Sequence, residues 1–320
     1  MEDFSELNLI GRSPAFLSAL NLLKKFASCD ATALIEGETG TGKDLAARAI
    51  HYLSPRCGYP FIPVNCGALP DTLIENELFG HRRGAYTDAR IDQAGLVELA
   101  RGGTLFLDEV DALTQKGQVT LLRFLQDHQF RPLGARREEQ ADVRILAASN
   151  RDLERQVAAG EFRLDLLYRL KLLHIVLPPL RERLGDPKLF AEHFVGIAAG
   201  RYKKPRLPVD RATLSWIERY AWPGNIRELE NLVHRAFLLA EDAHISIGAP
   251  VALEKAPPVI ALLNYRQAKS QAIAEFECRF LSNLLGQAQG NVTAAARMSG
   301  TERRQLGRLL KKYGIPKQAP

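Results

Sequence analysis

One short stretch of the chain combines closely spaced glycines with a lysine, residue types that bind phosphate groups. It is GETGTGKD, and it matches the pattern G-x-x-x-x-G-K with an aspartate in place of the usual serine or threonine. Glycines let backbone N–H groups close around phosphate oxygens, and a helix that begins here adds a favourable dipole. The predicted nucleotide-binding residues of this loop are Gly37, Glu38, Thr39, Gly40, Thr41, Gly42, Lys43 and Asp44.

Two carboxylates close the apolar run in GGTLFLDEV. A carboxylate at the C-terminal end of a parallel strand can hold Mg²⁺ beside bound phosphates, and we expect Asp108 to do so. Asp44 lacks the usual hydroxyl but could also bind the ion, directly or through water. We expect Glu109 to polarise an attacking water. The two stretches together predict a hydrolase of ATP or GTP, without deciding between the two nucleotides.

A parallel sheet would bring these residues to one edge. From Ile10 to about Leu180, short apolar runs alternate with helical stretches such as 44–53 and 116–127, which indicates an α/β fold with a mostly parallel sheet. The candidate strands are residues 33–36, 61–64, 104–107, 143–147 and 174–177.

The chain divides into four expected segments. Residues 1–180 form the α/β core, and residues 181–247 have helical patterns only. Residues 248–265 are an Ala- and Pro-rich linker, and residues 266–320 are helical again.

Composition excludes several classes of protein. The chain of 320 residues is 46% hydrophobic and 25% charged, which is ordinary for a globular protein. It has no apolar run long enough for a transmembrane helix, so no membrane partner is expected, and its start lacks a signal peptide. Four cysteines without C-x-x-C spacing argue against a disulfide framework or a zinc site and favour a cytoplasmic location.

The basic charge is concentrated at the C-terminal end. Residues 264–320 contain ten Lys or Arg and three Glu, so their net charge is +7. Because the whole chain has a net charge of +6, residues 1–263 carry a net charge of −1. A basic segment on a near-neutral body indicates either a nucleic-acid-binding domain or a solvated tail.

The pattern GNVTAAARMSGTERRQLGRLLKKYGI favours a helix-turn-helix. Asn291 is the expected N-cap of a short helix, and residues 302–312 form the expected recognition helix. Its predicted DNA-binding residues are Arg303, Arg304, Gln305, Arg308, Lys311 and Lys312. A basic helix that packs on the body is the alternative. The preceding segment has an apolar helical face that could pair two copies, formed by Phe276, Phe280, Leu281, Leu284 and Leu285.

Six motifs, in this order, resemble those of bacterial enhancer-binding proteins, the AAA+ ATPases that activate RNA polymerase carrying sigma-54. They are GETGTGKD, ELFGHRRGAYTDA, GGTLFLDEV, FRLDLLYRL, LPPLRER and WPGNIRELEN. The resemblance covers residues 8–245 and 270–316. It implies an AAA+ P-loop domain with a parallel sheet, an all-α lid and a C-terminal all-α Fis-type helix-turn-helix domain, with ATP and Mg²⁺ as cofactors and a hexameric ring.

The resemblance also implies roles for individual residues. Asn65 matches the residue that couples the catalytic glutamate to the nucleotide state, and Asn150 matches the sensor of the γ-phosphate. Arg163 and Arg169 match arginine fingers that enter a neighbouring subunit's site, and Arg227 matches a second sensor on the lid. From the residues alone, the asparagines could be strand-end caps and the arginines could pair with nearby carboxylates.

The stretch HRRGAYTDAR places a lone aromatic residue among small ones. The resemblance matches it to the GAFTGA loop, which contacts sigma-54. The implied contact residues are Gly84, Ala85, Tyr86, Thr87, Asp88 and Ala89. Tyr86 preserves the aromatic ring, whereas Asp88 adds a carboxylate and removes the freedom of glycine at positive φ. We expect Asp88 to weaken or retune the contact.

The leading hypothesis is a transcription activator that binds upstream double-stranded DNA, assembles from a dimer up to a hexamer and uses ATP to remodel sigma-54 RNA polymerase. One alternative is a DNA-binding regulator with a P-loop ATPase fold that does not activate sigma-54 by itself, or a partner subunit in a mixed ring. Another is a P-loop enzyme that acts on a different protein. The ATPase motifs begin close to Met1, so we expect control by a regulatory protein in trans or by expression level, with truncation of a longer protein as the alternative.

Overall fold

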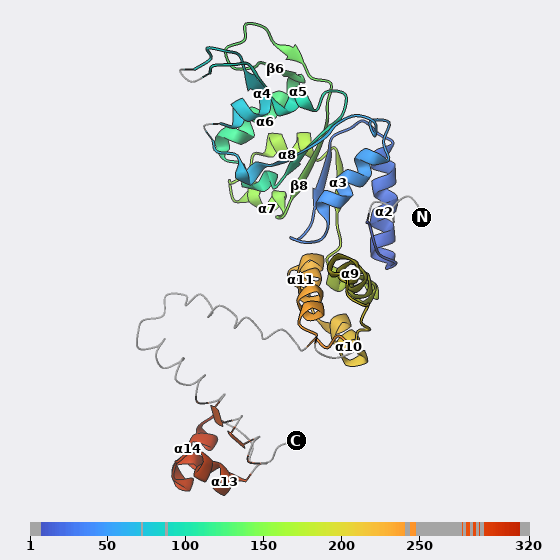
Figure 1. Ribbon diagram of the computed structural model, residues 1–320. Helices are drawn as coiled ribbons and strands as arrows, with labels where there is room; N and C mark the ends of the chain where they lie inside the picture. Colours follow the sequence, from blue (N-terminus) through green and yellow to red (C-terminus); the bar gives the residue numbers. More distant parts are fainter. Residues whose placement is uncertain are drawn as a thin grey trace. The chain divides into compact units, whose positions relative to one another are not determined.

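The computed structural model describes residues 8–71, 73–86, 89–240, 244–247 and 291–313, and single positions between 277 and 288. The chain forms two compact units, Met1–Ala249 and Pro250–Pro320. Figure 1 shows a mixed α/β first unit that ends in a group of helices, and a helical second unit. The predicted linker, residues 248–265, lies outside the described residues.

A five-stranded parallel sheet forms the centre of the first unit. Its strands lie in the order β2-β5-β8-β1-β9, and the predicted strands are confirmed to within one or two residues. Their bounds are β1 Ala33–Glu36, β2 Phe61–Asn65, β5 Thr104–Asp108, β8 Arg144–Ser149 and β9 Leu173–Val176. Because the strands are parallel, β2, β5, β8 and β1 deliver their C-terminal residues to the same edge.

Helices cover both faces of the sheet, as Figure 1 shows. On one face, α2 (Pro14–Ala27) and α3 (Lys43–Tyr52) bury a cluster that includes Ile35, Phe106 and Leu146. The other face packs against α6 (Gln115–Asp127), α7 (Leu153–Ala158) and α8 (Leu164–Leu170). Strands buried on both faces explain the continuous apolar runs in the sequence.

Short elements connect the strands on the α6 face. Asn65 leads into η1 (Cys66–Ala68) and then α4 (Ile74–Phe79), while α5 (Leu96–Leu99) precedes β5 and η2 (Val110–Ala112) follows it. Two hairpins are inserted in this region. They are β3 (Gly80–His81) with β4 (Gln93–Ala94), and β6 (Gln129–Phe130) with β7 (Glu139–Gln140).

The end of the first unit is helical, as predicted. It contains η3 (Leu180–Glu182), α9 (Asp186–Tyr202), α10 (Arg211–Arg219) and α11 (Asn225–Leu238). Its core surrounds Trp222, which is fully buried and donates from Nε1 to the Ile217 carbonyl at 2.8 Å. No helix in the described part of the chain is long and apolar enough to cross a bilayer.

The second unit contains α13 (Val292–Met298) and α14 (Arg303–Lys312). The Asn291 side chain accepts from the backbone N–H groups of Thr293 and Ala294, so the predicted N-cap is confirmed. The predicted pairing of two copies is wrong for three of its residues. Leu281, Leu284 and Leu285 are only 2–7% exposed, because they pack with Leu306 and Leu310 in the core of their own unit. Phe280 is 47% exposed, and Phe276 lies outside the described residues.

Candidate functional site

The phosphate loop joins β1 to α3 in a conformation that depends on its glycines. Gly40 and Gly42 have φ angles of 80° and 97°, a left-handed region that glycine adopts without steric cost. A Cβ on Gly40 would also lie 2.4 Å from the carbonyl oxygen of Gly224 in the helical segment. α3 begins at Lys43, so its first backbone N–H groups lack helical partners. The loop therefore ends at a helix N-terminus that suits a phosphate group.

Lys43 is buried at the centre of this loop. Its Nζ donates to the carbonyls of Gly37 and Glu38 at 2.7 and 3.1 Å, and to Oδ1 of Asn150 at 2.6 Å. Burial lowers the pKa of Lys43, and the carboxylates of Asp108 and Asp111 oppose that effect. The ammonium group is thus held beside the loop by acceptors that a bound phosphate could replace.

Glu109 is held by amides from the two neighbouring strands. Asn65 Nδ2 donates to Oε2 and Asn150 Nδ2 donates to Oε1, each at 3.2 Å. Glu109 itself has φ 55°, which is uncommon for a residue with a Cβ. The β2-β5-β8 order makes this grouping possible, since Asn65 ends β2, Glu109 follows β5 and Asn150 follows β8. Asn65 Oδ1 also caps η1 by accepting from the Ala68 N–H at 3.2 Å, so the amide both caps this turn and contacts Glu109.

Asp108 is the carboxylate best placed for a cation. It ends β5 half-buried, and burial raises its pKa, while the Glu109 N–H and Lys43 lower it. Asp44 is more exposed and pairs with Arg48 at 3.0 Å, although its charge also acts on Asp108. The described residues contain no cluster of three or more metal-ligating side chains. One or two carboxylates fit Mg²⁺ bound together with phosphates, which needs few protein ligands.

A third carboxylate on the same edge was missed in the sequence. Asp111 Oδ1 accepts from the Ser149 hydroxyl at 3.1 Å and from the Asn150 backbone N–H at 3.2 Å. Its side chain is only 9% exposed. Asp111 therefore fixes the end of β8 that carries Asn150. The only signal in the sequence was an additional acidic residue after LFLDEV.

The helical segment of residues 181–247, which is the predicted lid, forms hydrogen bonds directly to the phosphate loop. Asn225, fully buried with φ 51°, donates from Nδ2 to Glu38 Oε2 and the Thr39 carbonyl, both at 3.1 Å. Arg181 forms two hydrogen bonds to the Glu38 carboxylate, at 2.6 and 2.8 Å. The predicted nucleotide-binding residue Glu38 thus directs its side chain to the lid. This contact couples the position of the lid to that of the loop.

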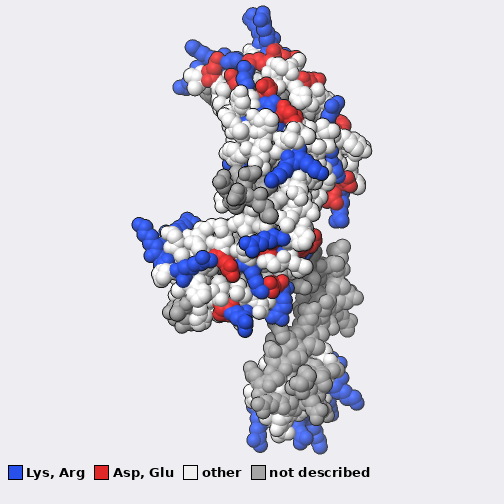
Figure 2. All heavy atoms as spheres, turned by 90° about the vertical axis from the view of Figure 1, so that its right-hand side faces the viewer, with Lys and Arg blue, Asp and Glu red and all other residues white. Residues whose placement is uncertain are grey.

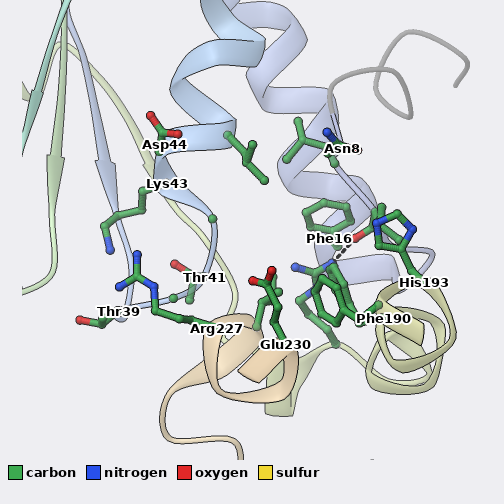
Figure 3. Close-up of a pocket in the computed structure, with 18 of the residues that line it drawn as sticks. Asn8, Phe16, Thr39, Thr41, Lys43, Asp44, Phe190, His193, Arg227 and Glu230 are labelled. Carbon is green, nitrogen blue, oxygen red and sulfur yellow. Dashed lines mark hydrogen bonds between the residues drawn. The ribbon is translucent and has the colours of Figure 1, made fainter. Parts of the chain in front are cut away.

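A cavity of about 430 Å³ lies between the loop and the lid. Lys43, Asp108, Glu109, Asn150 and Arg227 line its polar end. Figure 3 shows the nitrogens of Lys43 and Arg227 close together, whereas Asp44 points away from them. Arg227 forms no ion pair with any described residue, and its charge lowers the pKa of Lys43 further. Lys43 and Arg227 place two positive charges at this end, beside the carboxylates of Asp108 and Glu109, which suits phosphate groups bound together with a cation.

The other end of the cavity is apolar. Its lining includes Leu9, Ile10, Phe16, Phe190, Phe194 and Ile226, and Figure 3 shows the rings of Phe16 and Phe190 close together. A cavity with one charged end and one mainly apolar end suits a nucleotide, whose phosphates and base need these different environments.

A buried ion pair, also missed in the sequence, shapes that apolar end. Arg183 Nε donates to Asp186 Oδ2 at 2.9 Å, and both side chains are at most 2% exposed. The guanidinium lies 3.7 Å from the Phe16 ring centroid and donates to the Ile10 carbonyl at 2.6 Å. Asp186 also accepts from the Ser13 hydroxyl and backbone. The pair therefore fastens the N-terminal segment to α9.

Comparison with known families agrees with this geometry. Residues 9–176 match the sigma-54 interaction domain, residues 181–249 match an AAA+ ATPase lid domain, and residues 272–313 match a bacterial regulatory protein of the Fis family. The first match alone spans more than half of the chain. The chain belongs to the sigma-54-dependent transcriptional regulators. The predicted fold class, an AAA+ domain with a helical lid and a C-terminal helix-turn-helix domain, is confirmed.

Individual members of this family cover almost the whole chain. The regulatory protein AtoC of Escherichia coli is 40% identical over 319 residues, covering 96% of this chain and 68% of AtoC. The transcriptional regulatory protein GlrR of E. coli is 42% identical over 307 residues, with coverages of 96% and 68%. The crystal structure of NtrX from Brucella abortus in complex with ATP is 30% identical, with a TM-score of 0.69 and coverages of 96% and 69%. The regulator thus spans about two thirds of the length of these relatives.

The two predicted arginine fingers of the regulator lie outside its own cavity. Arg163 and Arg169 are exposed on or beside α8, and neither lines the cavity. Arg163 pairs with Asp165 at 2.7 Å, as the local alternative predicts. The apolar side chains of Leu164 and Tyr168, between the two arginines, are 50% and 71% exposed. Neither arginine therefore lines the cavity of its own subunit.

The predicted sigma-54 contact loop follows β3. Tyr86 is 46% exposed, and its ring packs against that of buried His81 at a centroid distance of 5.0 Å. Ala85 lies against Gly134 in the β6–β7 hairpin, where a Cβ on Gly134 would come within 2.9 Å of the Ala85 Cβ. The Gly84 N–H donates to the Ala89 carbonyl at 2.8 Å, which closes the loop. Thr87 and Asp88 lie outside the described residues.

The predicted DNA-binding side chains are all exposed on α14. Leu306 and Leu310 face inward and are at most 2% exposed, so the basic residues share the outward side. Figure 2 shows Lys and Arg side chains projecting from the C-terminal unit. Lys312 Nζ also lies 3.7 Å from Glu277 Oε2. An ion pair at the surface of this kind contributes little to stability.

Proposed function

We propose that the regulator hydrolyses ATP with Mg²⁺ and uses the reaction, as a ring of subunits bound to upstream DNA, to remodel RNA polymerase carrying sigma-54. The cavity that joins Lys43, Asp108, Glu109, Asn150 and Arg227 carries this proposal. ATP is favoured as the nucleotide because the similar NtrX was crystallised with ATP and with ADP.

In the proposed mechanism, Lys43, Arg227 and the first N–H groups of α3 bind the phosphates. Asp108 would hold Mg²⁺, which would supply positive charge beside the outer phosphates. Glu109 orients a water and takes its proton. Each carboxylate oxygen of Glu109 accepts one amide hydrogen bond, from Asn65 or from Asn150, and keeps a second lone pair that can accept from that water.

The hydrogen bonds supply a way to sense the phosphates. Lys43 bonds to Asn150, and Asn150 bonds to Glu109. A phosphate that attracts Lys43 would release Asn150 and thereby change how Glu109 is held. The effect can travel further along the chain, because Asn65 is followed directly by η1, α4 and the sigma-54 contact loop. Nucleotide state and loop position are coupled in this proposal.

DNA binding is separable from hydrolysis in this proposal. The double variant Arg303→Ala/Arg304→Ala should bind duplex DNA at least tenfold more weakly, because two cations leave the outward side of α14. Its ATP turnover should stay at the wild-type rate. Electrophoretic mobility shifts and phosphate release measure the two properties. The matched control is Arg201→Ala/Arg211→Ala, which removes two exposed lid arginines. An equal loss of both activities in the α14 variant would contradict two separable functions.

A second candidate function rests on Asp88, the carboxylate in the contact loop. The regulator would then bind DNA and ATP but would not activate sigma-54 by itself, or would act in a mixed ring. If Asp88 weakens the contact, Asp88→Gly should raise transcription from a sigma-54 promoter several-fold at unchanged ATP turnover. An unchanged or lower transcript level would show that the loop functions with its aspartate.

A further inference from the structure

Gly307 occupies an unusual position in α14. It lies in the interior of a ten-residue helix, where glycine destabilises the helix relative to alanine. A Cβ built on Gly307 meets no atom within 4 Å, and its φ is not in the left-handed region. Neither packing within the described residues nor backbone conformation therefore requires a glycine here.

The surroundings of Gly307 are strongly basic. Side chains three or four positions apart share one side of a helix, which places Gly307 beside the core residue Leu310 and beside the basic residues Arg303, Arg304 and Lys311, with a fourth, Arg308, next in the chain. All four are exposed, whereas Leu306 and Leu310 face the core. Gly307, itself half-buried, thus exposes backbone between Arg303 and Lys311, where the basic side of α14 borders the core.

We propose that Gly307 is the point at which α14 comes closest to the floor of the DNA major groove. This inference rests on the proposed DNA binding and adds a residue that determines specificity. Without a Cβ, the helix can enter deeply enough for the arginines on either side to reach base edges. An added methyl group would hold the helix away from the bases, while the long basic side chains would still reach phosphates. Sequence-specific binding should suffer more than non-specific binding.

The test combines helix stability with DNA affinity, both measured on the full chain. A duplex is first enriched from a random-sequence pool by the wild-type protein, and Kd values are then measured for that duplex and for an unselected one. Gly307→Ala and Gly307→Leu both introduce good helix formers, so amide hydrogen exchange in α14 should slow. The Kd for the enriched duplex should rise at least tenfold in Gly307→Ala and further in Gly307→Leu. The Kd for the unselected duplex should change by less than about threefold.

Gly196→Ala is the matched control. Gly196 also lies inside a helix, α9, with no atom within 4 Å of a built Cβ. This variant should bind both duplexes like the wild type. If the Gly307 variants bind the enriched duplex as tightly as the wild type, the inference is wrong. Weaker binding accompanied by faster exchange in α14 would also overturn it, since misfolding would then be the cause. A wild-type protein that enriches no sequence would overturn the DNA-binding role as well.

Discussion

Glu109→Gln is expected to lower the rate of ATP hydrolysis by about 10²–10⁴-fold and to leave ATP binding intact. The amide keeps the size of the carboxylate but cannot take a proton from water. Lys43 and Arg227, which would bind the phosphates, are unaffected by this change. Phosphate release measures turnover, and titration calorimetry in the presence of Mg²⁺ measures binding.

Two further variants serve as controls for that experiment, one that should lose nucleotide binding and one that should behave like the wild type. Lys43→Ala should lose binding and hydrolysis together, because it removes the buried ammonium from the loop. Glu138→Gln makes the same chemical change at an exposed glutamate outside the cavity and should behave like the wild type. Hydrolysis at the wild-type rate by Glu109→Gln would show that another group activates the water.

Arg163→Ala is expected to lower ATP turnover by about 10³-fold, since a guanidinium on the developing phosphate charge contributes that much in related chemistry. The reduction should appear only at concentrations at which subunits assemble. Nucleotide affinity should change little, because Arg163 does not line the cavity of its own subunit. Arg155→Ala is the matched control, an exposed arginine that also pairs with a nearby aspartate.

A mixing experiment tests whether Arg163 acts on a neighbouring subunit. Lys43→Ala subunits retain Arg163, and Arg163→Ala subunits retain Lys43. Where the two meet in the correct order, one intact nucleotide site is assembled from two inactive proteins. Turnover should therefore recover on mixing and reach its maximum near equal proportions. Two inactive variants that stay inactive when mixed, although they co-assemble, would place Arg163 outside the reaction.

The sequence predicted those parts of the site that local pattern determines. The apolar runs located all five strands, and the parallel order then brought Asn65, Glu109 and Asn150 to one edge. A glycine-rich loop between a strand and a helix has few conformations, which is why it could be recognised before the fold was known.

Contacts between distant segments could not be predicted in this way. Glu38 bonds to Arg181 and Asn225, which are far away in sequence, and the pairing depends on how the lid packs. Arg183 ends the motif LPPLRER and Asp186 follows three residues later, in a stretch rich in charged residues, yet both are buried because the N-terminal segment covers them. For the leucines before α13, the sequence predicted burial but not the packing partner. An apolar helical face indicates burial but does not identify the partner, which here is the same unit rather than a second copy.

Open-complex formation tests most directly whether the regulator uses ATP to remodel sigma-54 RNA polymerase. Purified regulator, sigma-54 RNA polymerase, ATP with Mg²⁺ and a sigma-54 promoter carrying an upstream site for the regulator are combined, and permanganate footprinting detects melted DNA. We expect melting at the start site that requires ATP, is lost with Glu109→Gln and falls when Arg303 and Arg304 are both replaced. Intact ATP hydrolysis and intact DNA binding without any promoter melting would contradict the proposed function.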